Sequence, residues 1–171
     1  MQRTNSFLLA LLCLMIFSCD SNRVFDTYNS LSGVWSQEDV QVFKYKSKDS
    51  TSEYNLFLNI RNTEDYPFNN LFIITELTYP QGKTLSDTLE YAMAYPDGKL
   101  IGTGFTSLKE NKLVYKEGFR FDELGEYTFQ ISQAMRKYDQ INGVKELKGI
   151  SDVGLRICLL YTSPSPRDAT L

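Results

Sequence analysis

The amino-acid sequence predicts an all-β domain built as an antiparallel two-sheet β-sandwich, either immunoglobulin-like or jelly-roll-like. The first observation is a series of roughly seven to nine short apolar or alternating segments, separated by turn signals about every ten residues. The second is period-two alternation over residues 53–61, with one exception. The third is the near absence of helical periodicity outside the N-terminal segment. A small barrel is the alternative arrangement of such strands.

The N-terminal segment, residues 1–18 (MQRTNSFLLALLCLMIFS), has the features of a secretory signal. Arg3 is its only charged residue, and the apolar run Phe7–Phe17 is too short to span a bilayer as a mature helix. The run ends in Ile16-Phe17-Ser18-Cys19, which resembles a bacterial lipobox. We therefore predict a lipoprotein signal peptide and lipidation of Cys19. An ordinary signal peptide with an incidental cysteine is the alternative.

Residues 19–32 are predicted to comprise the lipidated cysteine and a polar tether. Asp20–Ser32 holds only isolated hydrophobic residues among polar ones. The β-sandwich domain is expected to begin at Gly33-Val34-Trp35 and to extend over residues 33–157.

The first half of the domain contains the clearest strand signals. Val40–Lys46 carries apolar residues at short intervals, and Glu53–Arg61 alternates between apolar and polar side chains. Only Phe57 departs from that alternation, on the polar face. Asn62–Asn70 contains Pro67 and predicts a turn. Leu71–Tyr79 is apolar enough on both faces to be a central strand.

The second half continues with shorter strands. Thr84–Ala94 lies between the turn signals Pro80–Lys83 and Pro96-Asp97-Gly98. The remaining strands are expected at Lys112–Lys116, Gly118–Phe121, Tyr127–Gln133 and Val153–Ile157. Asn142 and Gly143 favour a loop within Gln133–Leu147 over a short helical turn.

The C-terminal segment Cys158–Leu171 (CLLYTSPSPRDATL) differs in composition from the rest of the chain. It contains two of the five prolines and shows no strand alternation. It resembles a peptide produced when sequencing-adapter bases are translated. We interpret residues 158–171 as an artefactual or disordered tail and exclude them from the fold.

Composition excludes several classes of function. The 171 residues include no histidine, which excludes Ser-His-Asp and Cys-His catalysis and HExxH zinc sites. A formal net charge of −3 does not match a nucleic-acid-binding surface. Neither a cysteine cluster nor a calcium-loop motif is present, so we predict no metal and no cofactor. The adjacent acidic pairs Glu64/Asp65 and Asp122/Glu123 lack the spacing that glycoside cleavage needs. We predict a protein that is not an enzyme and has no small-molecule substrate.

Aromatic residues and arginines are the remaining candidates for a binding role. Aromatic side chains, at 13% of the chain, serve either as core packing or as a sugar-stacking platform, and core packing is the simpler interpretation. Arg61, Arg136 and Arg156 lie at predicted strand or loop ends, where they pin loops by pairing with carboxylates such as Asp65 or Asp87 or bind a partner. The candidate partner-binding residues are Arg61, Tyr66 and Arg136.

Several segments, in this order behind a lipobox cysteine, resemble one known family. They are YNLFLNIRNT (54–63), DYPFNNLF (65–72), PQG (80–82), DTLEY (87–91), GTG (102–104), GEYTF (125–129), QAMR (133–136) and LKGISDVGLRI (147–157). Together they look like the gliding motility lipoprotein family GldH of Bacteroidetes, over nearly all of residues 19–157. The chain departs from the family pattern at Leu100-Ile101, where the family tends to show tryptophan, and at Cys158.

The resemblance implies a lipid-anchored cell-envelope protein of the gliding machinery that acts by protein–protein interaction. Its implied partners are the membrane, reached through the anchor, and other gliding motility and type IX secretion envelope proteins. No catalytic residues are carried over. A carbohydrate-binding module of the envelope is the alternative, which a row of exposed aromatic side chains would support.

Two further expectations concern orientation and modification. Surface-exposed lipoproteins of this phylum tend to carry an acidic run after the cysteine, whereas Cys19 is followed by Asp20-Ser21-Asn22-Arg23. We therefore expect the anchor in the outer membrane with the domain facing the periplasm. Asp49-Ser50-Thr51 and Asp87-Thr88-Leu89 resemble the short O-glycosylation signal of Bacteroidetes, with Ser50 and Thr88 as acceptors.

Overall fold

A computed structural model describes residues 22–104, 107–138 and 140–160 of the chain. These residues form strands and loops without a helix, as the sequence predicts. The strands are β1 (Arg23–Ser30), β2 (Val34–Ser36), β3 (Gln41–Ser47), β4 (Glu53–Asn62), β5 (Asn70–Thr78), β6 (Thr84–Ala92), β7 (Lys109–Arg120), β8 (Gly125–Gln133), β9 (Glu146–Lys148) and β10 (Ile150–Leu159). The predicted signal peptide and Cys19 lie outside the described residues.

The strands pair as one long antiparallel ribbon folded back on itself. β1 pairs with β10, β2 with β9, β3 with β8, β4 with β7, and β5 with β6. Two further pairings, β10 with β4 and β5 with β8, join parts of the ribbon into sheets of order β1-β10-β4-β7 and β3-β8-β5-β6. This nested arrangement is the jelly-roll form of the predicted sandwich.

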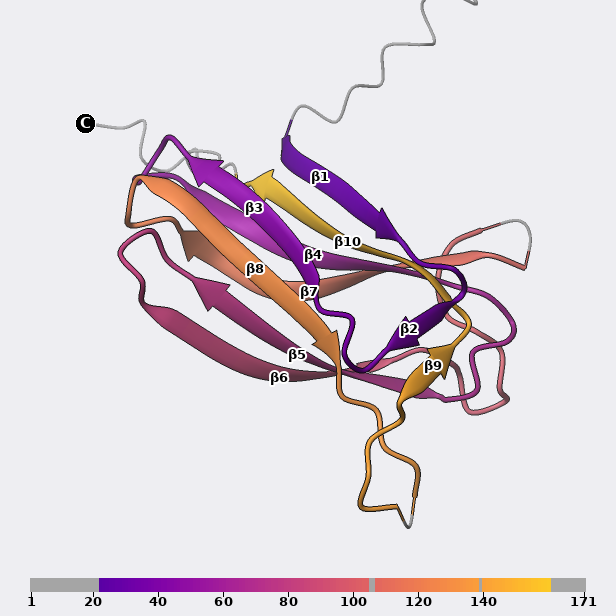
Figure 1. The fold of residues 1–171 in the computed structure, drawn as a ribbon. Helices are drawn as coiled ribbons and strands as arrows, with labels where there is room; N and C mark the ends of the chain where they lie inside the picture. The colour runs from indigo at the N-terminus through magenta and orange to yellow at the C-terminus, as the bar shows by residue number, and fades with distance from the viewer. Residues whose placement is uncertain (1–21, 105–106, 139, 161–171) are drawn as a thin grey trace, which may run out of the picture.

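The two four-stranded sheets pack face to face, and the short β2–β9 pair lies at one end of the sandwich (Figure 1). β1 begins and β10 ends at the opposite end, where the Leu159 amide donates to the Asn22 carbonyl at 2.7 Å. We call this the terminal end, and we call the end that carries β2 and β9 the distal end. The β4–β5 and β8–β9 loops lie at the distal end (Figure 1).

Alternation along the strands builds the core between the sheets. Leu56, Leu58 and Ile60 of β4 are fully buried, as the period-two pattern predicts. Leu71, Ile73 and Leu77 of β5 are also fully buried. Burial of each such side chain stabilises the fold by about 1.5–3 kcal/mol relative to exposure. β5 pairs on both sides, which confirms it as a central strand.

A group of contacting aromatic rings fills the core toward the terminal end. Phe121 is fully buried and lies 4.8–5.2 Å, centroid to centroid, from four neighbouring rings. The group consists of Phe25, Tyr45, Tyr54, Tyr79, Phe119, Phe121 and Tyr127. Such offset and edge-to-face contacts add stability beyond the buried area. For these residues, the core-packing interpretation is confirmed.

The domain is longer at both ends than residues 33–157. Arg23–Ser30, predicted as tether, forms β1, and Cys158 and Leu159 belong to β10 rather than to a tail. β1 shows no apolar alternation because, of its residues, only Phe25 packs against the core. Asp26 and Tyr28 hydrogen-bond to other strands on the outer face. The extension of β10 depends on backbone pairing, which a change in composition does not reveal.

Two other elements differ from the prediction. The expected loop within Gln133–Leu147 ends in β9, which pairs with β2 although Leu147 is its only buried residue. The two strands expected over residues 112–121 are one irregular strand, β7, whose register against β4 shifts on both sides of Leu56. Gly118, at φ 59°, lies in this irregular part of β7.

Candidate functional site

The three candidate partner-binding residues do not converge. Arg61 lies on the outer face of the β1-β10-β4-β7 sheet and Arg136 follows the end of β8, while Tyr66 lies in the β4–β5 loop. Each therefore has its own environment.

Arg61 belongs to a polar network on the outer face of its sheet. We call the six residues Asp26, Tyr28, Asn59, Arg61, Glu110 and Arg156 the outer-face cluster. Arg61 Nε donates to Glu110 Oε2 at 2.9 Å, and its guanidinium lies 4.2 Å from the centroid of the Tyr28 ring. The hydrogen bond to Glu110 raises the pKa of Arg61, so the guanidinium stays charged. Arg61 thus pairs with Glu110 rather than with Asp65 or Asp87, and Asp87 pairs with Lys116.

The remaining members of the outer-face cluster connect all four strands. Asn59 Nδ2 donates to the Tyr28 hydroxyl at 2.9 Å, and that hydroxyl donates to Glu110 Oε1 at 3.1 Å. Burial and the nearby Glu110 carboxylate raise the pKa of Tyr28. Arg156 Nη2 donates to Asp26 Oδ2 at 2.8 Å. These contacts give the outer-face cluster, including Arg61, a structural role in holding the sheet together.

Tyr66 does not present a surface to a partner. Its side chain is 5% exposed, and its hydroxyl donates to the Asn70 carbonyl at 2.6 Å. Burial raises the pKa of this hydroxyl. Gly149 allows the close packing, since a Cβ there would overlap the backbone of Tyr66. Tyr66 therefore packs in the core of the loop. Tyrosine occurs in both core and surface positions, which composition alone does not separate.

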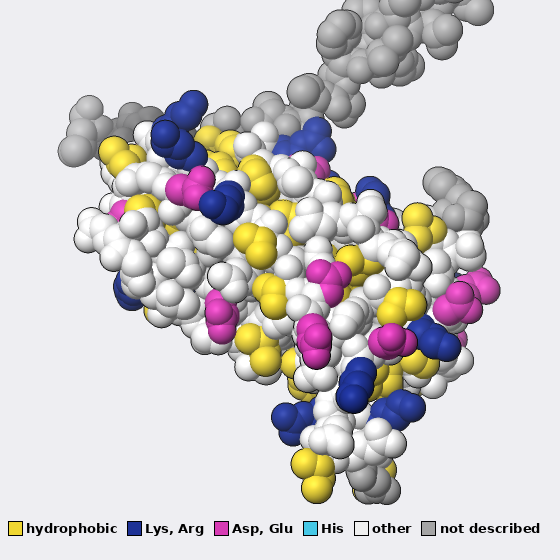
Figure 2. Space-filling model, in the orientation of Figure 1, with side chains coloured by type: hydrophobic (Ala, Val, Ile, Leu, Met, Phe, Trp, Pro, Cys, Tyr) yellow, Lys and Arg dark blue, Asp and Glu magenta, His cyan; other side chains and the backbone are white. Residues whose placement is uncertain are grey.

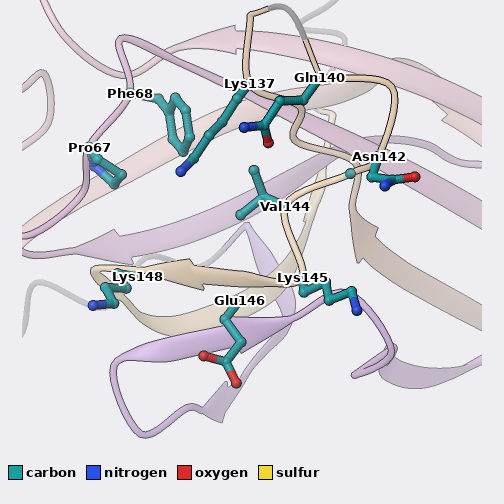
Figure 3. Close-up of a pocket in the computed structure, with 10 residues that line it drawn as sticks. Pro67, Phe68, Lys137, Gln140, Asn142, Val144, Lys145, Glu146 and Lys148 are labelled. Atoms are coloured by element: carbon teal, nitrogen blue, oxygen red, sulfur yellow. The ribbon is translucent and has the colours of Figure 1, made fainter.

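Arg136 stands at the base of the exposed β8–β9 loop. Its backbone bridges to Gly143 across this loop, and its side chain is exposed. An open groove of about 540 Å³ lies between this loop, β9 and the β4–β5 loop. Figure 3 shows the side chains of Phe68, Lys137 and Val144 directed into the same space. We call it the distal groove.

The distal groove combines apolar and basic side chains. Pro67, Phe68 and Val144 supply the apolar lining. The charged lining residues are Lys137, Lys145, Lys148 and Glu146. Sequence reasoning passed over these residues because they fall in a segment without strand periodicity. The sequence does carry one sign of a basic surface here. Asn142-Gly143 is a turn dipeptide, which brings together the segments before and after it, and these contain Arg136-Lys137 and Lys145.

The two predicted glycosylation acceptors differ in exposure. Thr88 is exposed on the outer face of the edge strand β6. Ser50 is half-buried in the β3–β4 loop, where the Asp49 carboxylate accepts hydrogen bonds from Thr51 and Ser52. These bonds lower the pKa of Asp49. Thr88 is therefore the more accessible of the two hydroxyls.

The described residues also bear on sugar binding, metals and membranes. Among the described residues, the aromatic side chains that are more than half exposed are Tyr95, at 52%, and Tyr138, at 95%. They lie on different loops rather than in a row. Among these same residues, no three His, Cys, Asp or Glu side chains come together in a way that suits a metal ion. None of the described segments forms a helix long and apolar enough for a membrane crossing.

Comparison with known proteins relates this chain to one family. The family model described as GldH lipoprotein matches residues 23–157. The chain is 50% identical over 157 residues to the gliding motility lipoprotein GldH of Flavobacterium johnsoniae, covering 92% of this chain and 98% of that protein. It is 48% identical over 151 residues to the GldH homolog of Christiangramia forsetii, covering 88% of this chain and 93% of that protein.

Solved structures give weaker matches. The VP2 subviral particle of infectious bursal disease virus matches with 14% identity and a TM-score of 0.40, covering 86% of this chain and 35% of that one. The structure of the Gx strain of the same virus matches with 12% identity and a TM-score of 0.41, covering 86% and 34%. Sequence similarity therefore carries the assignment. The chain belongs to the GldH lipoprotein family.

Proposed function

We propose that this protein is a lipid-anchored cell-envelope component of the gliding motility machinery that acts by binding other proteins. Relatives of about half-identical sequence are named gliding motility lipoproteins. The observation that carries the proposal is the position of Asn22, which enters the sandwich three residues after Cys19 and next to the end of β10. A lipid on Cys19 then holds the terminal end of the sandwich at the membrane.

The short connection supports a definite orientation of the domain. Three residues span at most roughly 11 Å, so the terminal end stays close to the lipid surface. The ten residues of β4 run from the terminal to the distal end, a length of roughly 34 Å at the usual rise of an antiparallel strand. The distal end is therefore presented to the aqueous space and to other proteins. We place the anchor in the outer membrane with the domain facing the periplasm, among gliding and type IX secretion proteins.

A binding role without catalysis agrees with the chemistry of the described residues. The chain contains no histidine. The half-buried carboxylates Asp26, Asp87 and Glu110 are each ion-paired to a basic side chain. Paired carboxylates of this kind stabilise a fold and are poorly suited to proton transfer.

The anchor is tested by replacing Cys19 in the full chain in its native cells. Cys19→Ala should move the protein out of the membrane fraction, and Cys158→Ala is the matched control because it leaves the lipobox unchanged. Gliding should be lost with Cys19→Ala and retained with Cys158→Ala. Persistence of the Cys19→Ala protein in the membrane fraction would refute lipidation at this residue.

The binding role is tested by crosslinking the anchored protein in its envelope and identifying captured molecules by mass spectrometry. Recovery of motility or secretion-system proteins supports the proposal. Recovery of glycan or peptidoglycan fragments without protein partners supports the carbohydrate-binding alternative instead.

A further inference from the structure

The β8–β9 loop exposes apolar side chains at its tip. Tyr138 is 95% exposed and Ile141 is 93% exposed, and the loop projects from the distal end of the sandwich (Figure 1). Single exposed apolar residues are ordinary in a domain of this size. Two of them three positions apart on one projecting loop form a local apolar surface, of the kind found at binding sites.

Basic residues surround this loop. Residues 136–148 contain Arg136, Lys137, Lys145 and Lys148 against two acidic residues, although the whole chain has a net charge of −3. Within the described part of the chain, the six ion pairs use other basic side chains, namely Arg23, Lys44, Arg61, Lys116, Arg120 and Arg156. Figure 2 shows Lys and Arg side chains gathered at the end that carries the projecting loop. The four basic residues of this segment are exposed and lie outside those six pairs.

The distal groove places an apolar surface beside these charges. Phe68 is half-buried, and it lines the groove together with Val144 and the side chain of Lys137. Figure 3 shows Glu146 and Lys148 on β9 along one side of the groove. An occupant that suits the distal groove is negatively charged and carries at least one apolar side chain.

The direction of the loop decides between a membrane and a protein as the occupant. A basic loop with an exposed tyrosine and isoleucine also suits an anionic lipid surface. However, the terminal end is the end connected to Cys19, and the loop points away from it at the other end of the sandwich (Figure 1). The loop does not reach the membrane that holds the anchor, which favours a protein.

We propose that the distal groove and the β8–β9 loop form a docking surface for an acidic segment of another envelope protein. Carboxylates of that segment pair with Lys137, Lys145 and Lys148, and its apolar side chains pack against Phe68 in the groove and against Tyr138 on the loop. Charge complementarity of this kind steers association and selects the partner. The inference rests on the proposed binding function and names the surface that performs it.

The test uses the full lipid-anchored chain in its native cells with a photo-crosslinking benzoylphenylalanine at position 138. The same probe at Val114 is the surface control. This residue is 45% exposed on the outer face of the β1-β10-β4-β7 sheet. We expect position 138 to capture another protein through a segment rich in Asp and Glu, with little capture from position 114.

Charge reversal then tests the lysines. The triple variant Lys137→Glu, Lys145→Glu and Lys148→Glu should lower the crosslink yield by about tenfold, because attraction at the rim becomes repulsion. The matched control replaces Lys46, Lys48 and Lys99 with Glu. These lysines are exposed and also lie outside the six ion pairs given above. All six substitutions lie on exposed side chains, and urea unfolding of both variants checks that the fold is retained.

The possible failures are distinguishable. Capture of phospholipid or of a second copy of this chain from position 138 overturns the inference. An unchanged crosslink yield in the triple variant overturns it as well. If position 138 captures nothing while position 114 captures a motility protein, the docking surface is wrong and the proposed function stands. If neither position captures a motility protein and the crosslinked envelope yields none, both proposals fail.

Discussion

The Tyr28 hydroxyl donates to Glu110 Oε1 at 3.1 Å and thereby links β1 to β7, the two edge strands of one sheet. The tyrosine ring extends across β10 to reach Asn59 on β4 and Glu110 on β7. Gly154 on β10 makes this possible, because a Cβ there would lie 2.8 Å from Tyr28 Cδ1. One side chain therefore joins three strands, β1, β4 and β7, on the outer face of the sheet by crossing over Gly154 of β10.

Removing the hydroxyl with Tyr28→Phe should lower the free energy of unfolding by about 1 kcal/mol, since it removes a hydrogen bond donated to Glu110 and one accepted from Asn59. Urea unfolding of the purified domain measures the change. Tyr138→Phe is the control, because that side chain is 95% exposed. Equal effects of the two substitutions would contradict the role of the Tyr28 hydroxyl.

Gly154→Ala should destabilise the domain by about 1–3 kcal/mol, because the added methyl group forces the Tyr28 ring out of place. The double variant Gly154→Ala and Tyr28→Ala should lose less stability in total than the sum of the two single losses, since the methyl group then meets no ring. A double-mutant cycle by urea unfolding gives this coupling. Additive losses would show that the two residues do not compete for space.

Leu58→Ala should cost about 2–5 kcal/mol, because Leu58 is fully buried between the sheets and its truncation leaves a cavity. Val114→Ala, at a side chain that is 45% exposed, should change the free energy of unfolding by no more than about 0.5 kcal/mol. Thermal unfolding of the two variants beside the unaltered protein compares them. A similar melting temperature for both variants would contradict the assigned core.

Stability should fall at alkaline pH. Burial raises the pKa of Tyr91 to about 12 and that of Tyr115 to about 12, from the ordinary value of 10.0. The folded state therefore holds these protons more tightly than the unfolded state, so the stabilisation is complete below pH 10 and is lost as the pH rises toward 12. Urea midpoints measured at intervals across this range should decline.

The double variant Tyr91→Phe and Tyr115→Phe isolates the contribution of these two hydroxyls. It should show a shallower decline over the same pH range, although its stability at neutral pH is lower because two hydrogen bonds are lost. Tyr138→Phe serves as the exposed control. An unchanged slope in the double variant would assign the alkaline loss to other groups.

Thr88 should carry the O-linked glycan in protein purified from its native envelope, because its hydroxyl is exposed on β6 whereas Ser50 is half-buried. Intact-mass measurement should show a mass excess beyond that of the lipid anchor, which Thr88→Ala removes and Ser50→Ala retains. A mass that the lipid anchor alone explains would exclude both acceptors.

The strands could largely be predicted from the sequence because side chains alternate between the two faces of a sheet. The pattern of Glu53–Arg61 predicts β4 and its buried face, and Phe57 lies on the outer face under the Lys112 ammonium as expected. The same reasoning could not find β1. Only Phe25 of this strand packs against the core, and Asp26 and Tyr28 bond to other strands, so the segment has the composition of a tether.

The candidate site shows a similar limit. Arginine at a strand end predicts an ion pair, and Arg61 forms one, yet its partner is Glu110, 49 positions away, rather than Asp65 or Asp87. That choice depends on the register between β4 and β7. The distal groove is also formed by segments far apart in the chain, with Phe68 on one side and Lys137 on the other.

The sequence by itself determined the all-β class, the strand faces and the family, because local alternation, turn residues and matching segments are properties of neighbouring residues. Only the tertiary structure decided the nested jelly-roll pairing, the burial of Tyr66, and the meeting of apolar and basic side chains at the distal end. These features depend on which strands pair and in which register. That choice is made by the packing of the whole core, to which each strand contributes only a part.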